Sequence, residues 1–410
     1  MPIHLLRAAA LAIALLPRFV AAAPLSLETA LDLAVQRSEA ARAARAGLDG
    51  ASEASRAAGQ LPDPMLRVGI ENVPVTGPDR FSTTRDFQTM KRIGISQEWL
   101  SQDKRAARRA VAEAEVGRAA VQARMAAADT RLQTALAYLD AWFAGEMLKL
   151  ATLTEHHVHE ELEASRARLA ASAGGSPEVL ALLAARGMAE DEAAEVRQQQ
   201  GTATASLQRW VGVTPDELAA VSALVVPSEE DYVAAHPAVS ALTHDIEVAR
   251  RSAAAVATER VPNWTWEVSY GQRSGYSNMM SLGVNIPLPV APAQRQDREI
   301  AAKLALVDKG EAELAEATRA AAAEYRTLVA EARRLQERIE RYNAAVLEPA
   351  AQRTAATMAA YRSNQASLAS LFEARHAEVE VQRRLLELQR SLARTQVQLA
   401  FRPLTPGASQ

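Results

Sequence analysis

The sequence predicts a mainly α-helical fold with a small β part, in which a unit of helix, β-hairpin, long helix and helix occurs twice. The first observation is composition: 49% of the 410 residues are hydrophobic but only 4% are aromatic, which is typical of long alanine-rich helices rather than of a thick core. The second is a set of four short segments in which apolar and polar residues alternate, the period of a β-strand. The third is the recurrence of the same order of elements in both halves of the chain.

The first 23 residues have the pattern of a secretory signal peptide. His4 and Arg7 precede an apolar run at 8–16, and three alanines at 21–23 offer a cleavage site before Pro24. No later segment of the sequence has the ~18 consecutive apolar residues of a transmembrane helix. The sequence has no cysteine, so we expect neither a disulfide framework nor a lipid on the mature N-terminus. We therefore expect an exported protein that can attach to a membrane only through its strands.

The first repeat is predicted at 24–214 and begins with a helix. Ser26 is expected to cap this helix, which continues to Gln60 because Pro62 and Pro64 end it. The other elements of this repeat are strands at about 65–73 and 87–99, a long helix at about 102–171 and a second helix at 177–210. At about 1.5 Å per residue, the long helix would extend roughly 100 Å.

The second repeat is predicted at 237–401, between a connector at 215–236 and a tail at 402–410. Pro349 falls inside its long helix and predicts a kink near Leu347. Its elements are a helix at 237–260, strands at about 264–271 and 279–288, a long helix at about 294–362, a turn at 363–365 and a helix at 366–401.

Short motifs align the two halves. Leu61-Pro62-Asp63 matches Val261-Pro262-Asn263 at a spacing of 200 residues, and Ile93-Gly94-Ile95-Ser96 matches Leu282-Gly283-Val284-Asn285. In each half the two shorter helices together are about as long as the long helix, which fits two short helices stacked end to end beside one long helix. These matches indicate an internal duplication.

Each predicted strand has an apolar face and a polar face, and its length is close to the roughly 9–11 residues that a tilted strand needs to cross a bilayer. Trp99 and Trp264 fall at the helix-side ends of their strands, where an aromatic girdle belongs. The residues expected to face lipid are Leu66, Val68, Ile70, Ile93, Ile95, Trp266, Val268, Leu282, Val284 and Ile286. The residues expected to face a water-filled lumen are Arg67, Glu71, Arg92, Ser96, Glu267, Ser269, Ser281 and Asn285.

Four strands cannot close a barrel, because membrane barrels begin at about eight strands and an open edge would leave backbone groups without partners in hydrocarbon. Strands from several copies must therefore complete the wall, and three copies would give twelve strands. The alternative is a small soluble sheet packed on helices. We consider it weaker because the apolar faces lack charge and the helices offer no bulky surface that would cover them.

The order of elements and several motifs resemble the TolC family of outer-membrane efflux proteins. The motifs are Asn285-Ile286-Pro287-Leu288-Pro289, Tyr361-Arg362-Ser363-Asn364-Gln365-Ala366-Ser367-Leu368 and Leu371-Phe372-Glu373-Ala374. The general architecture is most similar to the outer component of heavy-metal (cobalt–zinc–cadmium type) RND tripartite pumps. The resemblance implies a homotrimer in the outer membrane of a Gram-negative bacterium, with a trimeric twelve-stranded transmembrane β-barrel and a long periplasmic α-helical barrel.

The resemblance also implies a function and partners. The chain would be a passive conduit for substrates, heavy-metal cations among them, working with a periplasmic adaptor (membrane fusion) protein, an inner-membrane RND-type pump and outer-membrane lipid. The turns where helices reverse are expected to dock the adaptor through Gly174, Gly175, Ser176, Pro177, Asn364 and Gln365. Residues expected near the periplasmic aperture are Glu178, Ser370 and Glu373. Many family members have glycine where this chain has Asn364, and some carry a lipidated N-terminal cysteine that this sequence lacks.

The sequence offers no catalytic constellation: it has no phosphate-binding loop and no G-x-S-x-G motif, so we expect neither enzyme activity nor a cofactor. The net charge of −3 gives no indication of nucleic-acid binding. His156, His157 and His159 cluster near the end of the first long helix, but the run His159-Glu160-Glu161-Leu162-Glu163 lacks the second histidine of a zinc-protease motif. We favour a solvated helix face over a metal contact for this cluster.

A different class of function is a soluble periplasmic coiled-coil adaptor or scaffold, with the strands forming a soluble β-domain. That alternative predicts extraction without detergent, whereas the channel predicts fractionation with the outer membrane.

Overall fold

The computed structural model describes residues 24–172 and 174–404. The predicted signal peptide at 1–23 and the last residues of the predicted tail lie outside the described residues. Within this part, the chain forms two compact units, each assembled from separate stretches. The first unit comprises 24–38, 130–225 and 330–398, and the second comprises 39–129, 226–329 and 399–404.

Helices make up most of the described chain and occur in the same order in both halves. They are α1 (Leu27–Arg37), α2 (Glu39–Ala57), α3 (Gln102–Ala170), α4 (Ser176–Val211), α5 (Glu229–Ala234), α6 (Pro237–Thr258), α7 (Gln296–Tyr342), α8 (Glu348–Arg362) and α9 (Leu368–Phe401), with a short 3₁₀ turn at Pro292–Gln294. No helix within residues 24–172 and 174–404 combines the length and the hydrophobicity that crossing a membrane requires.

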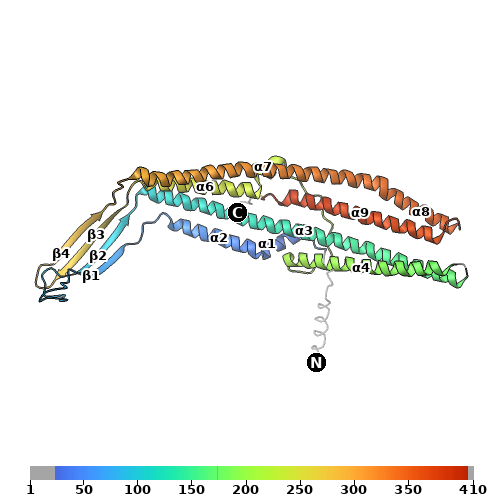
Figure 1. The fold of residues 1–410 in the computed structure, drawn as a ribbon, viewed down its shortest axis with the longest axis horizontal. Coiled ribbons are helices and arrows are strands. Elements are labelled where there is room, and N and C mark those ends of the chain that lie inside the picture. Colours follow the sequence, from blue (N-terminus) through green and yellow to red (C-terminus); the bar gives the residue numbers. More distant parts are fainter. Residues whose placement is uncertain (1–23, 173, 405–410) are drawn as a thin grey trace, which may run out of the picture. The chain divides into compact units, whose positions relative to one another are not determined.

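The second unit contains the predicted four-stranded sheet, whose strands lie side by side at one end of this unit (Figure 1). The strands are β1 (Met65–Glu71), β2 (Met90–Trp99), β3 (Trp264–Arg273) and β4 (Met279–Asn285). The sheet is antiparallel throughout, in the order β1-β2-β3-β4. Both predicted hairpins form, and pairing of β2 with β3 joins them. Two strands end earlier than predicted, because Asn72 has a positive φ of 57° and Pro287 cannot donate to a ladder.

The first unit is closed around Tyr138 of α3, which is fully buried. Its hydroxyl donates toward the carbonyl oxygens of Leu25 and Ala219 at 2.6 and 2.7 Å, and burial raises the pKa of Tyr138 to about 12. Ser26 caps α1 as predicted, because its Oγ accepts the backbone N–H of Thr29. The N-terminal segment and the chain after α4 are thereby tied to the same point of α3.

The second unit has a comparable centre at Tyr232 of α5, which is fully buried beside Leu328 of α7. Glu324 of α7 accepts a hydrogen bond from the hydroxyl of Tyr232 at 3.1 Å and forms a salt bridge with Nε of Arg402 at 2.8 Å. His236 is 8% exposed, with Nε2 at 3.6 Å from Glu324, and burial lowers the pKa of His236. The segment after α9 is thus fixed to α5 and α7.

Two expectations about the helices are corrected. The single helix expected from Ser26 to Gln60 is two helices, because Ser38 adopts an extended backbone (ψ 112°) and its Oγ lies 3.0 Å from Oγ1 of Thr130. The connector expected to be irregular contains α5, because Ser228 accepts the backbone N–H of Asp231 at 3.1 Å and caps a short helix that buries Tyr232.

The long helix expected at about 294–362 is interrupted as well. Between α7 and α8, residues Asn343–Leu347 form a π-helical turn. Pro349 follows within the first turn of α8, and its ring would clash with the carbonyl four residues earlier in a regular α-helix. A π-helical turn changes the hydrogen-bond ladder at that point. The kink predicted near Leu347 therefore corresponds to a π-helical turn that ends at this residue.

Candidate functional site: a sheet with two unlike faces

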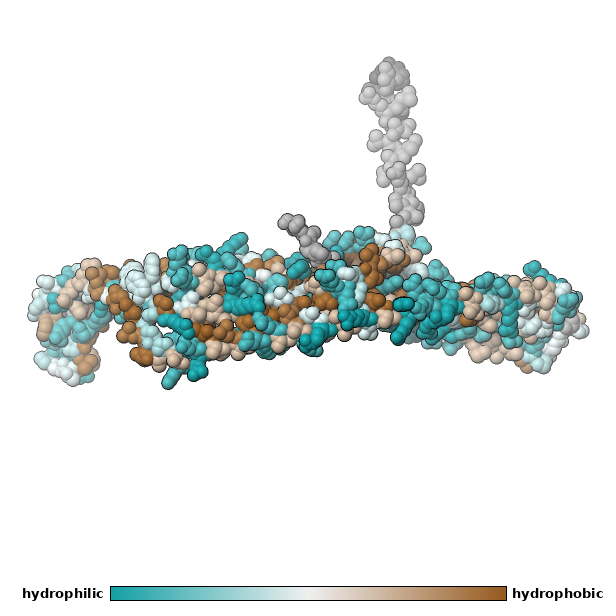
Figure 2. All heavy atoms as spheres, turned by 90° about the horizontal axis from the view of Figure 1, so that it is seen from above, coloured by the Kyte–Doolittle hydropathy of each residue, from teal (hydrophilic) through white to brown (hydrophobic). Residues whose placement is uncertain are grey.

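The apolar face of the sheet is formed by rows of residues that lie opposite one another across all four strands. One row joins Leu66, Ile95, Val268 and Leu282, which are direct partners in the three strand pairings. Most of this face is exposed: the exposed fraction is 67% for Leu66 and 75% for Leu282. Hydrophobic side chains accordingly reach the surface over the sheet in the space-filling view (Figure 2).

The polar face is organised around Arg92 of β2. Its guanidinium binds the carboxylate of Glu71 on β1 at 3.0 Å, donates to Oγ of Ser269 on β3 at 2.7 Å and lies 3.6 Å from Glu267. Arg67 lies 3.9 Å from the same Glu267. All five residues belong to the set expected to face a lumen. Their cross-strand pairing leaves this face polar but nearly balanced in charge.

Gly94 lies where β2 and β3 approach each other closely. A Cβ atom on Gly94 would lie 2.7 Å from Cβ of Ser269 and 3.0 Å from the carbonyl oxygen of Val268, closer than van der Waals contact allows. The backbones of β2 and β3 therefore approach each other here in a way that only glycine permits.

Aromatic pairs mark both ends of the strands. Trp99 and Trp264, both predicted girdle residues, are direct partners across β2 and β3, with ring centroids 5.9 Å apart. At the other end, Phe87 and Tyr276 lie in the loops beyond the strands, with centroids 6.1 Å apart. Sequence reasoning missed this second pair, because it assigned Phe87 to the predicted strand at 87–99 and Tyr276 to the segment between two predicted strands.

Lys104 links the start of α3 to the chain that enters β3. Its side chain is almost completely buried, and Nζ donates to Glu259 at 2.9 Å and to Asn263 at 2.7 Å. Asn263 in turn donates to Glu98 of β2 at 2.8 Å. This chain of contacts joins both hairpins to the adjoining helices and so fixes the base of the sheet.

The predicted docking turns have ordered caps. Gly175 precedes α4, and Pro177 occupies its first turn, where proline is favourable. At the second turn, Asn364 has a φ of 58°. That left-handed conformation favours glycine, and asparagine is among the residues that tolerate it. Asn364 therefore adopts a backbone conformation that glycine at this position would also tolerate.

The residues expected near the aperture already have partners in the first unit. Glu178 lies 3.8 Å from Arg168, and Glu373 lies 3.4 Å from Arg353 of α8. The backbone N–H of Ser370 donates to Oγ of Ser367 at 3.1 Å, so this residue helps to start α9. Whether these residues line an aperture remains a prediction.

Solved structures of membrane channels share this fold. CusC, which forms a transmembrane channel, matches with a TM-score of 0.74 and 15% identity over 92% of this chain and 91% of CusC. The outer-membrane channel OprN matches with a TM-score of 0.73 and 14% identity over 92% of this chain and 90% of OprN. The open-state MtrE outer-membrane channel of Neisseria gonorrhoeae matches with a TM-score of 0.70 and 15% identity over 92% of this chain and 88% of MtrE.

The chain has the fold of outer-membrane channels. This agrees with the mainly helical fold and small antiparallel sheet that the resemblance to the TolC family predicts. Comparisons with protein-family models and with characterised protein sequences gave no match, so the likeness is one of fold.

The three histidines of the cluster on α3 differ in exposure: His156 and His159 are exposed, whereas His157 is half-buried. His156 is exposed and lies 3.3 Å from Glu160, one turn further along α3. His157 is half-buried, and its Nδ1 has no hydrogen-bond partner among the described residues. Within residues 24–172 and 174–404, no three histidine, cysteine or acidic side chains converge as they would around a metal ion. The interpretation as a solvated face is therefore wrong for His157.

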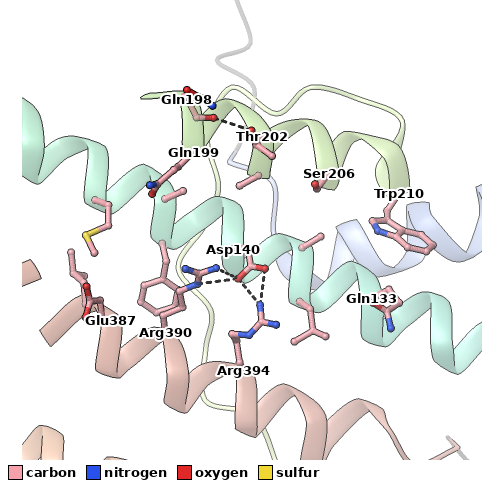
Figure 3. Close-up of a pocket in the computed structure, with 17 residues that line it drawn as sticks. Gln133, Asp140, Gln198, Gln199, Thr202, Ser206, Trp210, Glu387, Arg390 and Arg394 are labelled. Atoms are coloured by element: carbon pink, nitrogen blue, oxygen red, sulfur yellow. Dashed lines mark hydrogen bonds and ion pairs between the residues drawn. The ribbon is translucent and has the colours of Figure 1, made fainter. Parts of the chain in front are cut away.

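A cavity of about 690 Å³ lies between α3, α4 and α9 of the first unit. Arg390 and Arg394 of α9 point to Asp140 of α3, and Gln133 of α3 and Trp210 of α4 also line the cavity (Figure 3). Both guanidiniums bind the single carboxylate, at distances of 2.6 to 3.0 Å. No sequence pattern indicated this cluster, because Asp140 is about 250 residues away from its partners.

Proposed function

We propose that this chain is the outer-membrane channel of a tripartite efflux pump, a passive conduit from the periplasm to the exterior. The observation that carries the proposal is the sheet, with its exposed apolar face on one side and its Arg92-centred polar face on the other. A strand wall between lipid and water requires this division. The likeness in fold to outer-membrane channels supports it independently.

The edges of the sheet support assembly from several copies. In the described residues, β1 and β4 each pair on one side, so their outer backbone groups are left for another chain. Lipid cannot satisfy these groups, and only a closed wall removes the edges. We propose that β4 of one copy pairs with β1 of the next in a homotrimer, which gives a twelve-stranded barrel.

The helical part of each copy would then form the periplasmic barrel, and its turns would meet a periplasmic adaptor that connects to an inner-membrane RND pump. We propose Gly174 to Pro177 and Asn364 with Gln365 as the docking turns, because the helices reverse there. The proposed cargo, heavy-metal cations, rests on the resemblance of the sequence. A host that lacks the chain should become sensitive to Zn²⁺, Co²⁺ or Cd²⁺; sensitivity to organic compounds alone would refute this cargo.

A pair of neighbouring substitutions tests the channel directly. Leu282→Arg places a charge on the apolar face, where it would cost about 2–4 kcal/mol in the middle of a bilayer. Ser281→Arg places the same charge on the polar face of the same strand. We expect Leu282→Arg to abolish outer-membrane insertion and heat-dependent gel mobility, while Ser281→Arg keeps both. Equal behaviour of the two variants would refute the assignment of the faces.

The mature protein provides the second test. Detergent extraction followed by mass measurement should give a trimer, and planar bilayers should show conductance. A monomer that stays in solution without detergent would refute the channel and favour the adaptor or scaffold. Replacing Glu178 and Glu373 with glutamine should raise the leak conductance if they hold the aperture, and an unchanged leak would remove that role.

A further inference from the structure

Three polar side chains of α3 lie in a row in the first unit, two of them buried and one half-buried. His157, Glu161 and Ser165 are four residues apart and therefore share one face of the helix. The exposed fraction is 6% for Glu161 and 1% for Ser165. Nδ1 of His157 and Oγ of Ser165 have no hydrogen-bond partner among the described residues. Buried polar groups are normally paired, so a row of poorly paired ones requires an explanation.

The row packs against α9. Arg375 of α9 approaches Oε1 of Glu161 to 3.9 Å, which is longer than a hydrogen bond. Leu162, next to Glu161 on α3, and Leu371 and Ala374, close to Arg375 on α9, are each at most 3% exposed, so both helices are buried on either side of this contact. The carboxylate thus has a cation nearby, but little of the hydrogen bonding that would stabilise its charged form.

The other charged groups that act on the row come from α3 and α9. Glu378 of α9 and Glu160 and His156 of α3 act on His157 from a distance. Arg186 and Glu190 of α4, which belongs to the same unit, bind each other at 2.7 Å. The local charge balance therefore depends mainly on Glu161, His157 and Arg375.

We infer that Glu161 and His157 form a proton-binding site whose occupancy sets how firmly α9 packs on α3. With Glu161 protonated and His157 neutral, the contact buries no charge from α3. Loss of the proton from Glu161 leaves a poorly solvated carboxylate, and gain of a proton by His157 places a second cation beside Arg375. A rise in pH therefore weakens the packing through Glu161, and a fall in pH weakens it through His157.

The pKa shifts agree with this geometry. Burial raises the pKa of Glu161 from 4.5 to about 7, so its contribution to packing is greatest at low pH and is lost as the pH rises to about 7. Burial, followed by repulsion from Arg375, lowers the pKa of His157 below 6.5, so its contribution is present above pH 6.5 and is lost as the pH falls. The two groups therefore act with opposite signs in an overlapping range.

Hydrogen exchange on the intact protein separates the two contributions. The measurement is the protection of backbone amides at 157–165 and 368–379, corrected for intrinsic exchange, between about pH 5 and about pH 8. In His157→Asn, protection should decrease as the pH rises to about 7, by up to about tenfold per pH unit for one proton. In Glu161→Gln, it should increase with pH. The double variant should be flat, and Ser165→Ala should keep the slope of the native protein.

Equal slopes in both single variants would overturn the inference. A second measurement does not depend on variant stability: the infrared band of a protonated carboxyl should disappear from the native protein near pH 7 and be missing in Glu161→Gln. Its absence from the native protein would also overturn the inference.

Only the step from packing to conductance rests on the proposed function. If the chain is a channel, its conductance in planar bilayers should change with pH in the same range, and Glu161→Gln should remove the alkaline part of that change. A conducting channel with pH-independent exchange would refute the proton site alone. A pH-dependent exchange without conductance would refute the channel alone.

Discussion

Gly94 provides a sharp test of the close approach of β2 and β3. In Gly94→Ala the new Cβ would stand 2.7 Å from Cβ of Ser269 and 3.0 Å from the carbonyl oxygen of Val268. These atoms are backbone or the first atom of a side chain, so relief requires a shift of β3 itself. Overpacking of this kind costs about 1–3 kcal/mol. Since 1.4 kcal/mol is a factor of ten, the ratio of folded to unfolded protein at the native midpoint of unfolding should fall roughly 5- to 150-fold.

Gly69 and Gly283 provide matched controls on the same polar face. A Cβ on either residue would meet no described atom within 4 Å. Alanine at these positions should stabilise or leave unchanged the folded state, by less than about 1 kcal/mol, because it reduces the freedom of the unfolded chain.

The assay is a urea titration of the purified protein in detergent, followed by tryptophan fluorescence and by heat-dependent gel mobility. Trp99 and Trp264 lie at the ends of β2 and β3 and report on the strands that Gly94 brings together. We expect a lower midpoint for Gly94→Ala and unchanged midpoints for both controls. The same midpoint in all three variants would mean that β2 and β3 do not approach as closely as described.

Three further predictions test contacts within each of the two units. Lys104→Met should cost about 1–3 kcal/mol because Asn263 and Glu259 lose a buried partner, whereas Lys309→Met, which breaks an exposed pair of 3.4 Å, should cost under about 0.5 kcal/mol in the same urea titration. Tyr138→Phe should lower stability by about 1–3 kcal/mol because two carbonyl groups lose their donor; an unchanged midpoint would show that water replaces it. Burial lowers the pKa of His236, so stability should fall as the pH drops below about 6.5, and His236→Gln should remove that part of the pH dependence of thermal unfolding.

Much of the sheet could be predicted from the sequence, because strand faces depend only on a period of two. That period placed Arg92 and Glu71 on one face and Leu66 on the other, and the register confirms this division. Trp99 and Trp264 were likewise expected at the same end of their strands. Their direct pairing depends on how the two hairpins meet, and no local pattern determines that contact.

The missed features depend on partners far along the chain. The break at Ser38 coincides with a contact to Thr130, and Lys104 is buried because Glu259 and Asn263 reach it from the second repeat. From the sequence alone, a lysine near the start of a helix is expected to be exposed to solvent. His157 was misjudged for the same reason, since its burial depends on how α3 packs and neighbouring histidines of α3 are exposed.

The charge balance on the polar face gives the last prediction. Arg92 is the cation nearest to both Glu71 and Glu267, so Arg92→Gln leaves one uncompensated negative charge in each copy. An unpaired carboxylate attracts a cation 4 Å away by about 1 kcal/mol even in water, which is roughly a fivefold preference. If the polar face lines the pore, the reversal potential under a salt gradient should shift toward cation selectivity.

Lys91 is the matched control for this prediction. It precedes Arg92 in β2 and therefore lies on the apolar face, opposite Ile70 and Gln272, so the expectation that this face lacks charge is wrong at Lys91. Lys91→Gln changes the net charge by the same amount on the other side of the wall. We expect little shift in reversal potential for this variant. Equal shifts for both variants would show that ions sense the total charge of the protein, and the argument that the sheet separates water from lipid would then fail.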